Sequence, residues 1–207
     1  MKIVLISDTH GQHHQLELPE ADVLIHAGDF TRTGKPFQAQ DFLLWLERQP
    51  HRHKIFVAGN HDFICEEEPE LFRSWVPDNC IYLEDQLAEV EGLRIWGSPV
   101  TPRFFDWAFN RDRGEVICQH WSKIPDGLDV LVTHGPPGGV LDRTVQGEHT
   151  GCEDLRRHIE KARPRISVFG HIHESHGRMR LGDTEFFNAS VLDESYRMVN
   201  PPFVVEL

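Results

Sequence analysis

The stretch KIFVAGNHD, residues 54–62, decides the fold, because a short apolar run ends there in a cluster of polar side chains. Lys54 to Ala58 has the β-branched and aromatic composition of a strand. Gly59-Asn60-His61-Asp62 follows at once and offers an amide, an imidazole and a carboxylate. Four other segments repeat this design: Lys2 to Ser7 before Asp8-Thr9-His10, Val23 to His26 before Gly28-Asp29, Leu128 to Val132 before Thr133-His134, and Arg165 to Phe169 before Gly170-His171-Ile172-His173.

Helical patterns fill the intervals between these strands. The expected helices are Phe37 to Arg48, Glu70 to Val76, Glu115 to Lys123 and Glu153 to Ala162. Strands that alternate with helices, and that are apolar along their whole length, predict an α/β layered fold with both sheet faces covered. Residues 87–96 and 177–207 indicate shorter antiparallel strands, with turns at Glu91-Gly92 and Gly182-Asp183. Because no repeat, low-complexity tract or linker interrupts the pattern, residues 1–207 are expected to form a single domain.

The composition narrows the classes of function. The chain has 33 Asp and Glu against 21 Lys and Arg, a formal net charge of −12, so binding to extended nucleic acid is not expected. No run approaches the roughly 18 apolar residues of a membrane span, and the first residues carry no signal-peptide core. The four cysteines form no CxxC pair, which favours reduced thiols. We therefore expect a cytoplasmic protein without membrane contact, and the sequence carries no indication of its oligomeric state.

The polar residues that follow the strands suit a metal site. In open α/β sheets, ligands bind at the carboxyl ends of the strands, where these side chains would meet. Asp8 and His10, two residues apart on an extended segment, would point to one side, as would His171 and His173. Carboxylate, imidazole and amide donors without cysteine favour divalent ions such as Mn, Fe, Zn or Mg over a thiolate-rich zinc site. The candidate ligands are Asp8, His10, Asp29, Asn60, His134, His171 and His173.

Seven donors exceed the needs of one tetrahedral ion, so we expect two ions that share a carboxylate. Two metals roughly 3.5–4 Å apart are the standard arrangement for phosphoester hydrolysis. For any one of these residues alone, a satisfied buried polar group is the simpler interpretation. That interpretation does not explain why the same placement recurs after five strands.

The motifs taken together resemble a known superfamily. D-x-H (Asp8, His10), GD (Gly28, Asp29), GNHD (residues 59–62), TH (Thr133, His134) and GHxH (residues 170–173) resemble, in their order, those of the calcineurin-like binuclear metallophosphoesterases. IHAGDFT, WGSP, THGPP, FGHIHE and the closing NAS and NPP are similar to the small metallophosphoesterase-domain proteins related to class III cyclic-nucleotide phosphodiesterases. The resemblance spans most of the chain.

The resemblance implies a fold and a ligand set. The fold would be a four-layer α/β/β/α sandwich of two mixed sheets flanked by helices. Asp29 would bridge two divalent metal ions, with manganese the first choice and Fe, Zn or Mg as alternatives. The implied partition puts Asp8, His10, Asp29 and His173 on one ion, and Asp29, Asn60, His134 and His171 on the other.

The working hypothesis for the reaction is that a hydroxide bridging the two ions attacks phosphorus in line with the leaving oxygen. His61, next to Asn60, would protonate the leaving alkoxide or hold a phosphate oxygen. Asp62 would orient His61 through the second ring nitrogen of the imidazole. The alternative interpretation is that Asp62 is a plain turn residue. His61 and Asp62 are thus the candidate catalytic residues.

The segment Ser98 to Gly114 offers a candidate substrate contact, because it mixes aromatic and basic residues. Such a loop can stack a nucleobase and steady a phosphate, and we select Phe109, Asn110 and Arg111 for this role. The alternative is a loop that buries its own aromatic residues in the core.

These expectations converge on a metal-dependent phosphodiesterase that acts on a small, nucleotide-like diester such as a cyclic nucleotide. A nuclease or a phosphomonoesterase on the same core is one alternative. A non-catalytic phosphoesterase fold that binds another protein is the other, although chains of that kind lose ligands that are all present here.

Overall fold

The first of two large sheets carries three of the five strands that end in polar residues. In the computed structural model, which describes residues 1–207, the strand order of this sheet is β13-β1-β2-β3-β4. β1 to β4 run parallel, and β13 pairs with β1 in the antiparallel sense. The bounds are β1 (Lys2–Ile6), β2 (Val23–Ala27), β3 (His53–Val57), β4 (Cys80–Tyr82) and β13 (Phe203–Glu206).

The second sheet has six strands in the order β11-β12-β10-β9-β6-β5. Its four central strands are parallel, and an antiparallel hairpin ends each edge. Glu91 and Gly92, both with positive φ (50° and 85°), make the tight turn of one hairpin. The bounds are β5 (Gln86–Val90), β6 (Leu93–Ser98), β9 (Val130–Thr133), β10 (Ile166–Phe169), β11 (Gly177–Leu181) and β12 (Thr184–Asn188), and β7 (Thr101–Pro102) and β8 (Asn110–Arg111) form a separate two-stranded pair.

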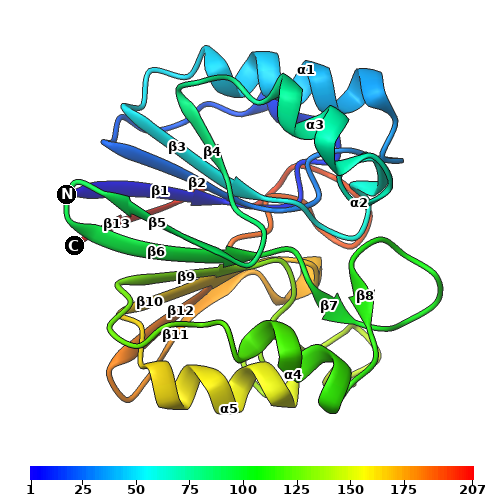
Figure 1. Ribbon diagram of the computed structural model, residues 1–207, viewed down its shortest axis with the longest axis vertical. Coiled ribbons are helices and arrows are strands. Elements are labelled where there is room, and N and C mark those ends of the chain that lie inside the picture. Colours follow the sequence, from blue (N-terminus) through cyan, green and yellow to red (C-terminus); the bar gives the residue numbers. More distant parts are fainter.

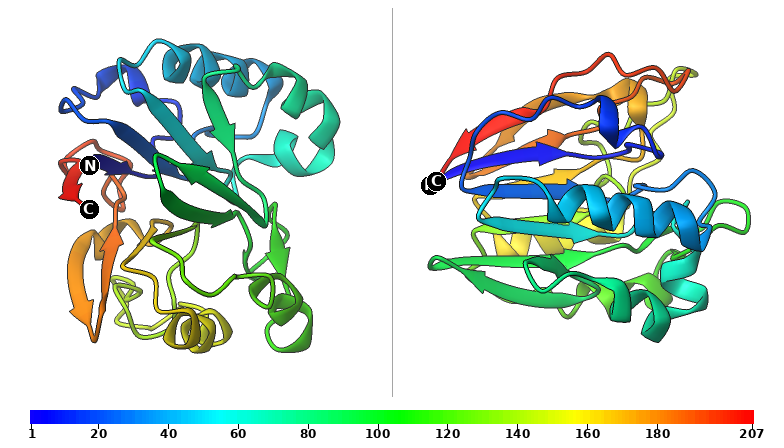
Figure 2. Two further views of the ribbon diagram at one scale, coloured as in Figure 1. Left: turned by 60° about the vertical axis from the view of Figure 1, so that its left-hand side comes forward. Right: turned by 90° about the horizontal axis from the view of Figure 1, so that it is seen from above.

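Helices cover the outer faces of both sheets, and the two inner faces pack on each other (Figure 1). The helices that follow β2 and β3 pack on the first sheet, and those before and after β9 pack on the second. The turned views show the same layers (Figure 2). This arrangement confirms the expected α/β/β/α sandwich of two mixed sheets. The helices are α1 (Pro36–Glu47), α2 (Phe63–Glu67), α3 (Pro69–Trp75), α4 (Glu115–Trp121) and α5 (Glu153–Ala162), with short 3-10 turns η1 (His13–Gln15) and η2 (His173–Ser175). None of these helices combines the length and apolar character needed to cross a membrane.

The alternation of side chains along β1 explains why its sequence is apolar throughout. Ile3 and Leu5 point into an apolar cluster of 18 buried residues between the sheets. Val4 and Ile6 point into a second cluster, of 20 buried residues, beneath α1 and α3. Because successive residues of a strand face opposite sides, a strand between two cores needs apolar residues at every position.

The carboxyl ends of β1, β2, β3, β9 and β10 lie on the same side of the molecule, away from the two chain ends (Figure 1). The loops that follow these strands therefore meet where the two sheets come together. Every candidate metal ligand lies in or just after one of these loops.

Candidate metal centre

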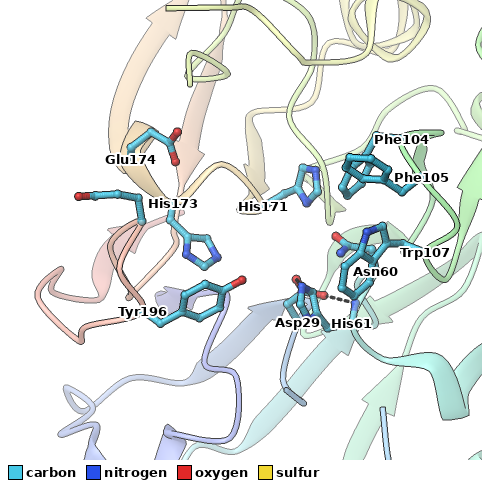
Figure 3. A pocket seen from close by; sticks show the side chains of 11 residues that line it. Asp29, Asn60, His61, Phe104, Phe105, Trp107, His171, His173, Glu174 and Tyr196 are labelled. Carbon is cyan, nitrogen blue, oxygen red and sulfur yellow. Dashed lines mark hydrogen bonds and ion pairs between the residues drawn. The ribbon is translucent and has the colours of Figure 1, made fainter. Parts of the chain in front are cut away.

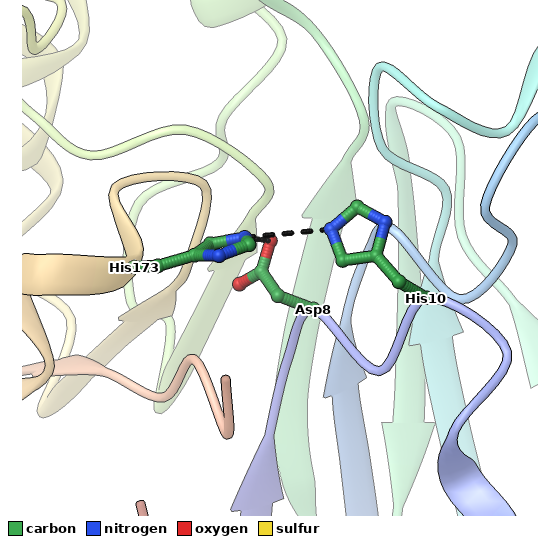
Figure 4. A group of neighbouring side chains, drawn as sticks. All are labelled: Asp8, His10 and His173. Atoms are coloured by element: carbon green, nitrogen blue, oxygen red, sulfur yellow. Dashed lines mark hydrogen bonds and ion pairs between the residues drawn. The ribbon is translucent and has the colours of Figure 1, made fainter. Parts of the chain in front are cut away.

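Asp8, His10 and His173 bring three ligand atoms together at the end of β1, as Figure 4 shows. The Nε2 atoms of His10 and His173 are 3.4 Å apart, and His173 Nε2 is 3.4 Å from a carboxylate oxygen of Asp8. His10 Nε2 also lies 3.6 Å from Asp29 Oδ2. All four side chains are buried. They form one compact set of donors.

Asp29 also belongs to a second set, which contains His134, His171 and Asn60. Its Oδ2 atom lies 3.4 Å from His134 Nε2, and His134 Nε2 is 2.9 Å from Asn60 Oδ1. Asp29, His134 and His171 place one ligand atom each within 4.8 Å of one another. The structure thus brings all seven predicted ligands together in two groups that share Asp29.

Backbone carbonyls set the hydrogen position on three of these rings. A carbonyl oxygen only accepts, so each Nδ1 donates a hydrogen and the Nε2 of the neutral ring offers a lone pair. Lone pairs that face one another and face carboxylates require a proton or a metal ion between them. The chemistry of the donors therefore fits bound cations. The Nδ1 bonds are those of His10 to the Thr31 carbonyl (3.2 Å), His173 to that of Asp193 (3.0 Å) and His134 to that of Ala27 (3.0 Å).

Protons take the place of metal ions in the metal-free protein. Burial acts to lower the pKa of His134 and of His173, but the carboxylates of Asp29 and Asp8 raise both pKa values to about 9. The same pairing works in reverse on the acids. Although burial acts to raise it, the pKa of Asp29 falls well below its usual range beside His134, and that of Asp8 falls beside His173.

Four of the predicted ligands have a left-handed backbone. Asp8, His10, Asp29 and His171 have φ values of 56°, 41°, 57° and 69°. The extended geometry that the sequence suggested for the pairs Asp8/His10 and His171/His173 is therefore wrong. Asp8 and His10 still share one group of donors, whereas His171 and His173 belong to different groups. For residues other than glycine this conformation costs about 1–3 kcal/mol, and it persists where the surrounding structure holds it in place.

Two glycines allow the chain to approach the carboxylates closely. A Cβ atom at Gly170 would collide with the carboxylate of Asp8 and with the side chain of Ser7. A Cβ atom at Gly59 would collide with Asp29. Glycine is thus required in the GNHD and GHxH motifs because any side chain there would clash with the candidate metal ligands.

His61 lies at the edge of the centre, half-buried, with its Nε2 4.0 Å from Asp29 Oδ2. The structure corrects the expected partner of its other nitrogen. His61 Nδ1 is 2.9 Å from the backbone carbonyl of Arg32, and Asp62 makes no contact with the ring. The indole of Trp107 lies against the same imidazole, with ring centroids 4.4 Å apart.

Asp62 instead joins the loop after β2 to the loop after β3. Its carboxylate accepts hydrogen bonds from the backbone and hydroxyl of Thr31 (both 2.8 Å), the N–H of Gly59 (2.8 Å) and the N–H of Phe30 (3.3 Å). Burial and the neighbouring Asp29 carboxylate raise the pKa of Asp62 to about 7 against these bonds. These contacts agree with the alternative interpretation of Asp62, that of a structural residue in a turn.

A cavity of about 360 Å³ opens over the metal-type donors (Figure 3). Phe104, Phe105 and Trp107 form one wall, and Tyr196 lies opposite (Figure 3). No lysine or arginine is among its lining residues, which are Asp29, Asn60, His61, Phe104, Phe105, Trp107, His171, His173, Glu174, Glu194 and Tyr196.

The three residues selected as substrate contacts lie elsewhere. Phe109 is 2% exposed and belongs to the apolar cluster beneath α1 and α3. Asn110 is also 2% exposed, and its amide bonds to the hydroxyl of Thr101 across the β7–β8 pair. Arg111 pairs with Glu66 at 2.9 Å, and the same carboxylate accepts the N–H of Phe109. The pairing of β8 with β7 turns these residues away from the cavity, so their proposed role is corrected.

Sequence reasoning found the polar floor of the cavity but did not select the aromatic and acidic residues that form its walls. Phe104, Phe105 and Trp107 come from the aromatic loop that it singled out, but from the turn between β7 and β8. Tyr196 and Glu194 lie in a turn that carries no motif and is far from the first ligands along the chain. Only the chain fold places that turn beside His10, whose ring centroid is 4.9 Å from that of Tyr196.

The class of protein follows from this fold and site together with sequence comparison. Residues 1–175 match the family of calcineurin-like phosphoesterases, so the chain belongs to that family. It is a metallophosphoesterase, a metal-dependent hydrolase of phosphoesters. Membership implies a centre of two divalent ions, for which the Asp and His groups described above are the candidate ligands.

Particular relatives resemble the chain along its whole length. It is 40% identical over 230 residues to human metallophosphoesterase domain-containing protein 1, covering 100% of this chain and 71% of that protein. It is 36% identical over 217 residues to UPF0046 protein K07C11.7 of Caenorhabditis elegans, covering 99% and 74%. The crystal structure of the protein TT1561 of Thermus thermophilus has the same fold, with a TM-score of 0.61, 11% identity, and coverage of 99% and 98%.

Proposed function

We propose that this chain hydrolyses small, nucleotide-like phosphodiesters such as cyclic nucleotides, with two manganese ions as its cofactor. The observation that carries the proposal is the cavity above the donors, which combines an aromatic wall with a lining that contains no lysine or arginine. Ligand cavities for small molecules have volumes of roughly 300–1,000 Å³, and this one has about 360 Å³. A long nucleic acid needs a basic track, which the lining lacks.

The proposed ligand sets follow the two groups of donors. Asp8, His10, Asp29 and His173 would hold one ion. Asp29 would also hold the second ion, with Asn60, His134 and His171. When bound, the pair of ions supplies positive charge that stabilises the phosphoryl group as negative charge builds on its oxygens. Nitrogen and oxygen donors without sulfur support manganese over softer ions.

His61 is the proposed general acid. The carbonyl of Arg32 occupies its Nδ1–H, so Nε2 is the atom that gains and loses the catalytic proton. That atom faces the donors at the floor of the cavity, 4.0 Å from Asp29 Oδ2. A leaving oxygen above the centre would lie within its reach, and the adjacent Trp107 restrains the ring.

The aromatic wall supports a flat substrate group. Phe104 and Trp107 have nearly parallel rings, 19° apart, on one side of the cavity. Tyr196 lies on the other side, with its ring 4.9 Å from that of His10. Stacking of a base on such rings contributes about 1–3 kcal/mol per base and tolerates different bases. We propose that this wall receives the nucleobase.

We also propose a cytoplasmic location, which the reduced state of the thiols supports. All four cysteines are free, and they are Cys65, Cys80, Cys118 and Cys152.

A screen of metals against substrates tests the proposed activity. The protein, stripped of metal and reloaded with Mn, Fe, Zn or Mg, is assayed on bis-p-nitrophenyl phosphate, p-nitrophenyl phosphate, cyclic nucleotides and a fluorescent single-stranded oligonucleotide. We expect the highest kcat/KM on cyclic nucleotides with manganese. Faster turnover of the monoester or of the oligonucleotide would replace the proposal with a phosphomonoesterase or a nuclease. A protein that retains no metal and shows no turnover would be a binding protein instead.

The His61→Ala variant tests the role of His61. We expect kcat to fall by about 10²–10⁴ with the metal content unchanged, because the variant lacks the proton donor and keeps every proposed ligand. His53→Ala, which removes an imidazole paired with Glu91 on the surface, is the matched control and should retain full activity. Unchanged turnover in metal-loaded His61→Ala would refute the assignment.

A further inference from the structure

A second group of metal-type donors lies outside the centre described above. His13 and His14 are on η1, and Asp41 is on α1. Asp41 Oδ2 is 3.1 Å from His13 Nε2 and 3.2 Å from His14 Nε2. One ligand atom from each of the three residues lies within 4.8 Å of the others. Neighbouring ligands on a tetrahedral zinc ion are about 3.3 Å apart, so the two distances between histidine and carboxylate already suit an ion.

The core fixes the position of one of these rings. His13 is fully buried, and its ring packs against Phe42 and Trp45 with centroids 5.6 and 5.1 Å away. Its Nδ1 has no hydrogen-bond partner, so Nε2 is the nitrogen that it presents to a ligand. A ring held in this way loses little conformational freedom when it binds an ion.

The other two side chains leave the group open to solvent. The side chains of His14 and Asp41 are 59% and 54% exposed. Asp41 also lines a cavity of about 520 Å³ that extends to His10. An ion can therefore enter from water and keep a water molecule as its fourth ligand. Two imidazoles and one carboxylate are an established ligand set for zinc.

We propose that His13, His14 and Asp41 form a zinc site that is separate from the catalytic centre. The ion would tie η1 to α1. Because η1 begins three residues after His10, this tie would steady the loop that carries one of the catalytic ligands. The site depends on neighbouring histidines at positions 13 and 14 and does not rest on the proposed substrate.

Zinc content, compared between variants, tests the site. The stripped protein is equilibrated with micromolar zinc, freed of excess metal and analysed for zinc per chain by mass spectrometry. We expect His14→Ala and Asp41→Asn each to bind one zinc ion fewer than the natural chain. His149→Ala is the matched control, because His149 pairs with a single carboxylate, that of Asp142, and should leave the count unchanged.

The comparison is independent of the catalytic centre, since zinc held there contributes equally to every protein in the series. His14 and Asp41 are exposed, so both variants are expected to fold, and circular dichroism of the metal-free proteins checks this. Equal zinc counts in the natural chain, His14→Ala and Asp41→Asn would overturn the proposal. An equal loss in His149→Ala would overturn it as well, because the lost ion would then be bound non-specifically.

Discussion

At the scale of single residues, the loops of the metal centre depend on the carboxylate of Asp62. This buried group accepts four hydrogen bonds from Phe30, Gly59 and Thr31, and so joins the loop after β2 to the loop after β3. The adjacent loop residues Asp29 and Asn60 are candidate ligands. The position of two ligands therefore rests on a side chain that makes no contact with the imidazole ring of His61.

Replacement of Asp62 by Asn tests this contribution. The amide nitrogen would replace one accepting oxygen and face N–H donors that have no other partner. We expect the free energy of unfolding to fall by about 1–3 kcal/mol, measured by urea denaturation. Asp106→Asn, at a fully exposed side chain, should leave it unchanged. Equal stability of Asp62→Asn and the natural chain would contradict the role.

The histidine pKa values predict how metal binding depends on pH. His134 and His173 have pKa values of about 9 in the metal-free protein, so below that pH an ion must displace their protons. His10 and His171, whose pKa values burial lowers to about 4 and about 3, are already neutral at pH 7. Affinity for manganese should therefore rise between pH 7 and pH 9, by about tenfold per pH unit for each proton released.

Calorimetric titration with manganese in two buffers of different ionisation enthalpy measures both the affinity and the number of protons released. An affinity that does not change over this range would show that the two imidazoles are not ligands or that they are neutral before metal binds.

The residues of the site could be predicted from the sequence only where they belong to a motif. Asp8, His10 and the GNHD residues follow apolar strands, and the structure brings them together. Tyr196 follows no strand and has no motif, so only the tertiary fold reveals it. Phe109 was misjudged because an aromatic residue in a basic loop looks the same in sequence whether it faces solvent or the core.

At the scale of elements, the loop after β10 passes close to the end of β1. This close approach fixes the position of the Asp8 carboxylate in the metal centre. Gly170 lies where any Cβ atom would meet Asp8 and Ser7, and its φ is not in the left-handed region. The backbone conformation there therefore permits alanine, and only the clash of its Cβ atom with Asp8 and Ser7 opposes the substitution. This separates steric crowding from backbone strain.

Gly170→Ala should displace the carboxylate of Asp8 and reduce the manganese content by at least one ion per chain. The cost of overpacking is typically about 1–3 kcal/mol, so the variant is expected to remain folded. Gly177→Ala, where the nearest heavy atom would be 3.3 Å away, is the matched control for the same substitution. Full metal content in Gly170→Ala, measured by elemental analysis, would contradict this account.

Elements were predictable where either periodicity or a motif marks them. The helices α1 and α5, of 12 and 10 residues, stand out because periodicity accumulates over several turns. The strands β1, β2, β3, β9 and β10 have only four or five residues each and stand out because they are apolar and are followed by a motif. β4 has three residues and no motif after it, and α2 has five residues, too few to show a helical period. Both depend on contacts with distant segments. The β7–β8 pair has two residues in each strand, and its pairing decided which aromatic residues reach the cavity.

At the scale of the whole molecule, the candidate ligands are divided between the two sheets. Asp8 and Asp29 follow strands of the first sheet, whereas His134 and His171 follow strands of the second. A metal ion that binds this set links the two halves of the sandwich where only loops meet. Bound metal should therefore stabilise the whole fold.

Removal of metal by EDTA should lower the Tm. An ion present at a hundred times its Kd contributes about 2.7 kcal/mol, or roughly 5–10 °C for a chain of this size. Differential scanning calorimetry of the manganese-loaded and stripped protein measures the difference, and His134→Ala should show a smaller one. Identical Tm values for loaded and stripped protein would contradict a link between the sheets.

The charge of the cavity lining affects whether the enzyme can bind its substrate. Asp29, Glu174 and Glu194 contribute negative charge there, and no lysine or arginine opposes it. Two divalent ions would add four positive charges and release the two protons that His134 and His173 hold in the metal-free protein, so the local charge would become more positive by two. Stripped protein should therefore bind phosphoesters and free phosphate more weakly than metal-loaded protein does. Metal supply would thus control how tightly the enzyme binds a phosphoester as well as how fast it reacts.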